Sequence, residues 1–95
     1  MFAGKDRKLI RTLIYPVQFE KDPTSAVDRI AGQIEKGKVL VASPLDYFNA
    51  IRSGLESTEQ LSGLIPQNHS EQVIREYLRS LNARLEAMPA KVEEA

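Results

Sequence analysis

Residues 69–88, HSEQVIREYLRSLNARLEAM, decide the fold class of this 95-residue chain. Apolar side chains recur in this stretch at steps of three and four residues, which places them on one face of an α-helix. Ser70 supplies a side-chain oxygen at the start of the pattern, and Pro89 stands where a helix must end. The stretch predicts a long amphipathic helix with the buried stripe Val73, Ile74, Tyr77, Leu78, Leu81, Leu85 and Met88.

Residues 23–36 predict a second helix. Asp22 can cap its first amides, and Pro23 fits the first turn, where no amide hydrogen is needed. Gly32 interrupts the helical pattern at a cost of about 1 kcal/mol relative to alanine, and we expect it to permit the close approach of another helix. The apolar face consists of Val27, Ile30, Ala31 and Ile34.

Residues 43–66 predict two more helices. Ser43 and Asp46 have the spacing of a capping box at the start of the first. Ser57 begins a second, short helix that Pro66 ends. The two apolar faces are Leu45, Phe48, Ile51 and Leu55, flanked by Tyr47 and Ala50, and then Leu61, Leu64 and Ile65.

The N-terminal stretch carries two conflicting patterns. Helical spacing runs from Leu9 to about Leu13, but apolar residues in 13–19 then alternate, and Pro16 blocks a continuing helix, so we expect an extended segment there. Residues 39–42 form a short apolar run that is compatible with a second strand. The main prediction is an all-α fold, a compact bundle of four to five short helices. The alternative is an α+β fold with one two-stranded pair, residues 13–19 and 39–42.

Composition limits the class of protein. We assign residues 1–89 to a single helical domain and residues 90–95 to a flexible C-terminal tail. The chain has no cysteine, and 13 basic residues balance 13 acidic ones. This composition excludes disulfides and thiolate sites and disfavours a strongly cationic nucleic-acid binder. No apolar run approaches the roughly 20 residues that span a bilayer, and the first residues lack a signal-peptide pattern, so we expect a cytoplasmic protein without membrane contact.

Few side chains in the sequence are suited to catalysis. His69 is the only histidine, and no nucleophile, acid or base stands at a motif spacing from it. The carboxylates are scattered without the spacing of a calcium loop, and no glycine-rich phosphate loop is present. We therefore predict that the protein is not an enzyme, with no catalytic residue, no metal site and no cofactor.

A window without cations is the candidate binding surface. The sequence contains no lysine or arginine from Ser53 to Ile74, which argues against a DNA-reading helix in this region. Its carboxylates would give a negative patch that can meet a basic protein, although a helix connection with inward apolar residues is the plainer reading. The predicted partner-binding residues are Tyr47, Glu56, Glu59, Gln67, His69 and Glu71.

The basic N-terminal segment supports an alternative function. Lys5, Arg7, Lys8 and Arg11 would contact phosphate groups in a regulatory or nucleic-acid-associated module. A solvated helix face is the plainer reading of such a run. An oligomerisation module built on residues 73–88 is a third reading, and the sequence does not predict whether the chain forms a homo-oligomer.

Residues 61–71, LSGLIPQNHSE, continue into residues 73–78, VIREYL. Together with Ala50 and Ile51, this pattern resembles the C-terminal half of small immunity proteins encoded beside bacterial polymorphic toxins, including those of contact-dependent growth inhibition systems. The resemblance covers about half of the chain. It implies a small protein without catalytic residues that binds and neutralises one cognate toxin by occlusion. Many nuclease inhibitors of this kind are markedly acidic, whereas this chain is neutral, so its negative charge would have to be concentrated locally.

Overall fold

The computed structural model describes residues 4–35 and 43–87. These residues form four α-helices and three short 3-10 helices, without a strand among them, which confirms the all-α prediction. The predicted tail at residues 90–95 and the apolar run at residues 39–42 lie outside the described residues. In chain order the elements are α1 (Gly4–Ile14), η1 (Tyr15–Val17), η2 (Pro23–Ala26), α2 (Val27–Glu35), α3 (Pro44–Glu56), η3 (Leu61–Gly63) and α4 (Glu71–Glu86).

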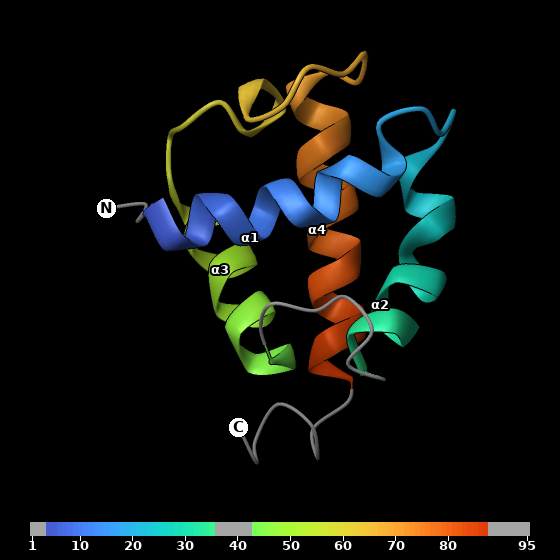
Figure 1. Cartoon of the computed structure of the whole chain (residues 1–95), viewed down its shortest axis with the longest axis vertical. Helices are drawn as coiled ribbons and strands as arrows, with labels where there is room; N and C mark the ends of the chain where they lie inside the picture. Colours follow the sequence, from blue (N-terminus) through green and yellow to red (C-terminus); the bar gives the residue numbers. More distant parts are fainter. Residues whose placement is uncertain (1–3, 36–42, 88–95) are drawn as a thin grey trace.

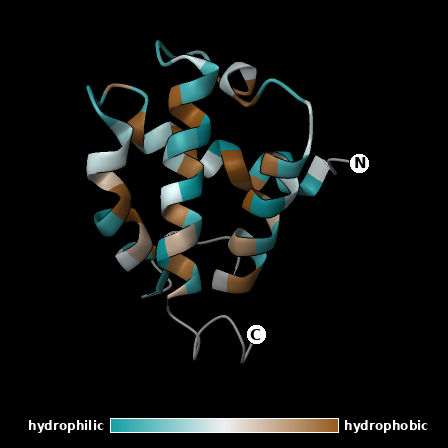
Figure 2. Cartoon of the chain, turned by 180° about the vertical axis from the view of Figure 1, so that it is seen from behind, coloured by the Kyte–Doolittle hydropathy of each residue, from teal (hydrophilic) through white to brown (hydrophobic). Residues whose placement is uncertain are grey.

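Helix α4 is the central element of the bundle. Helices α2 and α3 pack against it, and α1 packs on α3 and runs across α4 (Figure 1). The hydroxyl of Tyr77 on α4 donates a hydrogen bond of 2.7 Å to the carbonyl of Leu13 and so joins α4 to α1. Burial raises the pKa of this hydroxyl, so it keeps its donor proton. Figure 2 shows hydrophobic and hydrophilic residues alternating around the helices, as amphipathic helices require.

Side-chain caps set where the helices begin. Ser43 Oγ accepts from the amide of Asp46 at 3.2 Å, and Asp46 Oδ2 accepts from the amide of Ser43 at 3.3 Å, so the predicted capping box is confirmed. Ser70 Oγ accepts from the amide of Val73 at 3.2 Å and fixes the start of α4 at Glu71. These bonds satisfy amides that have no partner inside the helix.

The prediction of an extended segment at residues 13–19 is wrong. Helix α1 continues to Ile14, and η1 follows with Pro16 in its first turn, where the missing amide hydrogen costs no hydrogen bond. Helical geometry buries Val17 but leaves Tyr15 67% and Phe19 90% exposed. A strand would have placed all of these alternating side chains on one buried face.

Two short predicted helices form as 3-10 turns. Residues 23–26 form η2 before α2 begins at Val27, and the short helix expected after Ser57 is reduced to η3. Asp22 caps η2 as predicted, because its Oδ1 accepts from the amide of Thr24 at 3.1 Å. The apolar residues of both turns, Ala26 and Leu61, still reach the core.

Gly32 does not permit a close helix contact, contrary to the expectation from sequence. A Cβ atom built at Gly32 meets no atom within 4 Å. We therefore expect Gly32→Ala to raise the free energy of unfolding by about 0.5–1 kcal/mol, because alanine restricts the unfolded chain and favours the helix. Urea denaturation followed by circular dichroism measures this change. A loss of stability would contradict the open surroundings of Gly32.

Candidate binding surface

The predicted acidic surface carries no unpaired carboxylate. Glu59 accepts two hydrogen bonds from Arg7 on α1, and these bonds raise the pKa of the guanidinium. Glu71 accepts from Arg75 Nε at 2.6 Å. Glu56 pairs with Arg52 at 3.5 Å. The prediction of free negative charge in this window is therefore wrong, because arginines from α1, α3 and α4 pair with its carboxylates.

Tyr47 is not part of an accessible surface. Its side chain is fully buried in the core, together with Ala50 and Ile51. The prediction that Tyr47 contacts a partner is wrong, because the face of α3 that packs into the core includes this side chain. Leu45 and Phe48, which were expected to point inward, are only half-buried.

Gln67 and His69 shape the segment that joins η3 to α4. Gln67 Nε2 donates to the carbonyls of Ser62 and His69 at 2.8 and 3.0 Å, and its Oε1 accepts from the amide of His69 at 2.6 Å. His69 Nε2 lies 3.0 Å from the carbonyl oxygen of Val17. These contacts tie the segment to η1, so both predicted binding residues have structural partners.

Arg75 holds the end of α3 and the start of the following segment. Its Nη1 donates to the carbonyl of Leu55 at 3.1 Å, and its Nη2 donates to the carbonyls of Ser57 and Glu59 at 3.1 and 2.9 Å. A guanidinium can do this because its donors lie in a fixed planar fork. Arg75, which also pairs with Glu71 on the same helix, therefore connects α4 with the end of α3 and the segment that follows it.

The pKa of Glu71 is lowered in the folded protein. Partial burial acts in the opposite direction, but hydrogen bonds from the backbone of Ser62 and Leu61 and from Arg75 outweigh it. The amide of Ser62 donates to Glu71 Oε1 at 2.8 Å. These bonds favour the charged carboxylate and link the start of α4 to η3.

A depressed folded-state pKa makes the contribution of Glu71 depend on pH. The stabilisation is complete above the ordinary value of 4.5 and is lost as the pH falls through the lower folded value. We expect Glu71→Gln to reduce the loss of stability at acid pH when the free energy of unfolding is measured from pH 7 to 2.5. Glu76→Gln, on the exposed side of α4, is the matched control. If stability depended on acid pH in the same way in the two variants, the role of Glu71 would be contradicted.

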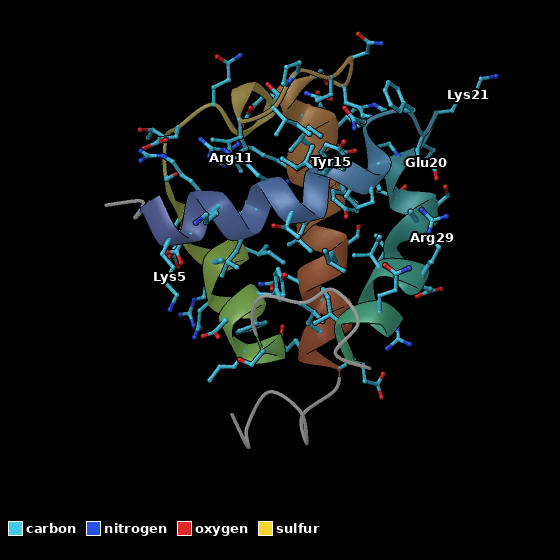
Figure 3. All side chains as sticks on the ribbon, in the orientation of Figure 1. Lys5, Arg11, Tyr15, Glu20, Lys21 and Arg29 are labelled. Atoms are coloured by element: carbon cyan, nitrogen blue, oxygen red, sulfur yellow. The ribbon has the colours of Figure 1, made fainter. Side chains whose placement is uncertain are left out.

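The outer side of α1 carries the charge and the apolar surface that remain available. Lys5, Lys8 and Arg11 are exposed and form no ion pair with a described residue. Tyr15 and Phe19 are the exposed large hydrophobic side chains of the described chain. Arg11 on α1 and Tyr15 on η1 lie along the same edge of this helical stretch in Figure 3. The exposed basic side chains of α1 are thus followed by an exposed ring at Tyr15, and a second exposed ring, Phe19, lies in the segment after η1.

An open hollow of about 450 Å³ lies between α1 and the segment before α4. Two cations and an aromatic ring come from α1 and η1, and one aliphatic side chain comes from the opposite segment. Such a wall can hold an anionic group beside an apolar one. Sequence reasoning missed this site because it assigned Tyr15 to an extended segment. The hollow is lined by Lys8, Arg11, Thr12, Tyr15 and Ile65.

Within residues 4–35 and 43–87, no three histidine or carboxylate side chains gather as metal binding would require. None of the helices in these ranges is both long and apolar enough to cross a membrane. No family model, curated protein or solved structure matches the chain.

Proposed function

We propose that this chain is a small non-catalytic domain that binds a protein partner and acts by covering part of its surface. The exposure of Tyr15 beside Lys8 and Arg11, together with the exposure of Phe19 in the segment after η1, carries the proposal. Aromatic side chains and arginine are enriched where proteins meet, and they supply much of the binding energy there. Lys8, Arg11, Tyr15 and Ile65 line one hollow, and we call these four residues together with the exposed Phe19 the α1 corner.

Neutralisation of a cognate bacterial toxin in the cytoplasm is the specific form of this proposal, and the sequence resemblance is its support. In that resemblance the matching residues include Gln67, His69 and Glu71, which hold the segment before α4 in place. We therefore assign the partner contact to the α1 corner and a supporting role to the matching segment. Occlusion requires no catalytic residue, since a bound inhibitor blocks the partner's own surface.

The test compares two variants of the tagged protein. Wild-type protein is used to capture its partner from native cells or from cells that make the product of the neighbouring reading frame, and the purified pair is measured by calorimetry. We expect the double variant Tyr15→Ser, Phe19→Ser to bind at least about 30-fold more weakly, which corresponds to the loss of one interface hot spot. Circular dichroism confirms that the variant is folded.

Glu56→Lys is the matched control, because it changes the acidic window without touching the α1 corner. We expect it to bind the partner as the wild type does. Undiminished binding by the double variant would place the interface elsewhere, and weakened binding by Glu56→Lys would restore the acidic window. In the toxin form of the proposal, the wild type but not the double variant restores growth to cells that make the toxin.

A nucleic-acid-associated module is the second candidate function. Lys5, Lys8 and Arg11 are exposed on α1 and Tyr15 is exposed just after it, and single strands bind to cations combined with a stacking ring. It ranks second because three cations contact few phosphates and the chain as a whole is neutral. Retention on heparin at moderate salt, lost on neutralising Lys5, Lys8 and Arg11, would favour it.

A further inference from the structure

We infer that the hollow beside α1 receives an acidic segment of the protein partner, with a carboxylate against Lys8 and Arg11 and an apolar side chain between Tyr15 and Ile65. This inference rests on the proposed function and adds the chemistry of the partner. The hollow lies at the α1 corner, so the same docking would bury both the cations and the exposed aromatic ring.

The charge of the hollow selects an anion. Its lining contains two basic side chains and no carboxylate. Most described arginines already bind a carboxylate of this chain, as Arg7, Arg75 and Arg84 do, but Arg11 pairs with no described one. Its planar fork therefore stays available for a carboxylate from another chain, which it can bind with two parallel hydrogen bonds.

The remaining lining selects an apolar neighbour for that anion. Tyr15 and Ile65 present an aromatic and an aliphatic surface, whereas the hydroxyl of Thr12 donates to the carbonyl of Lys8 at 3.0 Å. A volume of about 450 Å³ accommodates one or two side chains rather than a whole domain. An alternating acidic and apolar peptide matches both surfaces better than a polyanion, which would leave the Ile65 surface without an apolar partner.

The hollow is formed before any partner arrives. Its two sides, α1 and the segment before α4, are joined at one end by Arg7 and Glu59. At the other end they are joined by the contact of His69 with Val17. Ile65 lies in the sequence between these two anchored points, so docking orders little of the chain and loses little entropy.

The test is an NMR titration of the ¹⁵N-labelled protein with a blocked peptide of alternating glutamate and leucine. We expect saturable shifts at the amides of Arg11, Thr12, Tyr15 and Ile65. Arg11→Gln should weaken binding at least about tenfold, as the loss of one charge-assisted bond predicts. Arg79→Gln, an exposed arginine on α4, should bind as the wild type does.

Two further probes define the ligand class. The peptide with glutamine in place of glutamate should not bind, and hexathymidylate should bind more weakly than the acidic peptide. Equal binding of the glutamine peptide, tighter binding of hexathymidylate, or no shifts at millimolar acidic peptide would each overturn the inference.

The natural partner separates this inference from the proposed function. If Arg11→Gln keeps full partner affinity while Tyr15→Ser, Phe19→Ser loses it, the acidic-segment inference is wrong and the α1 corner stands. If neither variant loses affinity, the acidic-segment inference and the assignment of the interface to the α1 corner are both wrong. If both variants lose affinity, the inference and the assignment are both supported.

Discussion

Replacing Tyr47 with alanine is expected to lower the free energy of unfolding by about 3–5 kcal/mol, because the truncation removes a large ring from the core. Tyr47 is fully buried. A domain of this size has a total stability of about 5–14 kcal/mol, so the variant should be close to the limit of folding. The midpoint of thermal unfolding should fall by at least about 12 °C, as measured by circular dichroism.

Tyr15→Ala is the matched control for this prediction. It is the same truncation at a side chain that is 67% exposed. It should change stability by no more than about 0.5 kcal/mol, because little packing is lost. Partner affinity should respond in the opposite way: Tyr15→Ala weakens it, and Tyr47→Ala preserves it at a temperature where the variant is folded. Equal stability losses in the two variants would contradict the assigned burial.

The helices with strong local signals could be predicted from the sequence. The capping box at Ser43 and Asp46 forms as its spacing predicts, and the stripe on α4 is buried from Ile74 to Leu85. Both signals act within one element, so they do not depend on how the helices are arranged. Val73 is the exception among the described residues of the stripe, since it is half-buried at the first turn of α4.

The phase of α3 could not be predicted with the same accuracy. Leu45, Phe48, Ile51 and Leu55 have helical spacing, but the buried face is rotated toward Tyr47. Apolar residues lie on several sides of this helix, so packing against α1 and α4 decides which side faces the core. A tyrosine beside an apolar stripe is therefore a poor guide to an accessible surface.

The candidate site was hidden for a similar reason. Reading Pro16 as the end of helical structure separated Tyr15 from Lys8 and Arg11, although their spacing continues along one side of a helix. The acidic window was misread because its neutralising cations come from other elements. Arg7 and Glu59 are 52 residues apart in the chain, and no local sequence pattern predicts that they pair.

Replacing Arg75 with methionine is expected to lower the free energy of unfolding by about 3 kcal/mol. The variant keeps an unbranched apolar stem but loses the charged bond to Glu71 and three bonds to carbonyls. Hydrogen bonds to a charged donor contribute more than neutral ones, and a partly buried carboxylate without its partner adds a desolvation cost. Urea denaturation measures the change.

Arg79→Met controls for the loss of an arginine from α4. Arg79 is exposed and forms no ion pair with a described residue, so we expect a change within about 0.5 kcal/mol. Arg75→Lys should fall between the two variants, because a single ammonium cannot reach the three carbonyls in the fixed geometry of a guanidinium. A loss in Arg79→Met as large as that in Arg75→Met would mean that general charge, not this bond network, stabilises the fold.

The Arg75 variant also probes how the hollow is maintained. Arg75 does not line the hollow, but it holds the carbonyls of Ser57 and Glu59 in the segment that leads to Ile65. Under conditions where Arg75→Met is folded, hydrogen exchange should therefore be faster at the amide of Ser62, and the acidic peptide should bind more weakly. Unchanged peptide affinity alongside faster exchange would show that the contact of His69 with Val17 is sufficient to position the Ile65 side of the hollow.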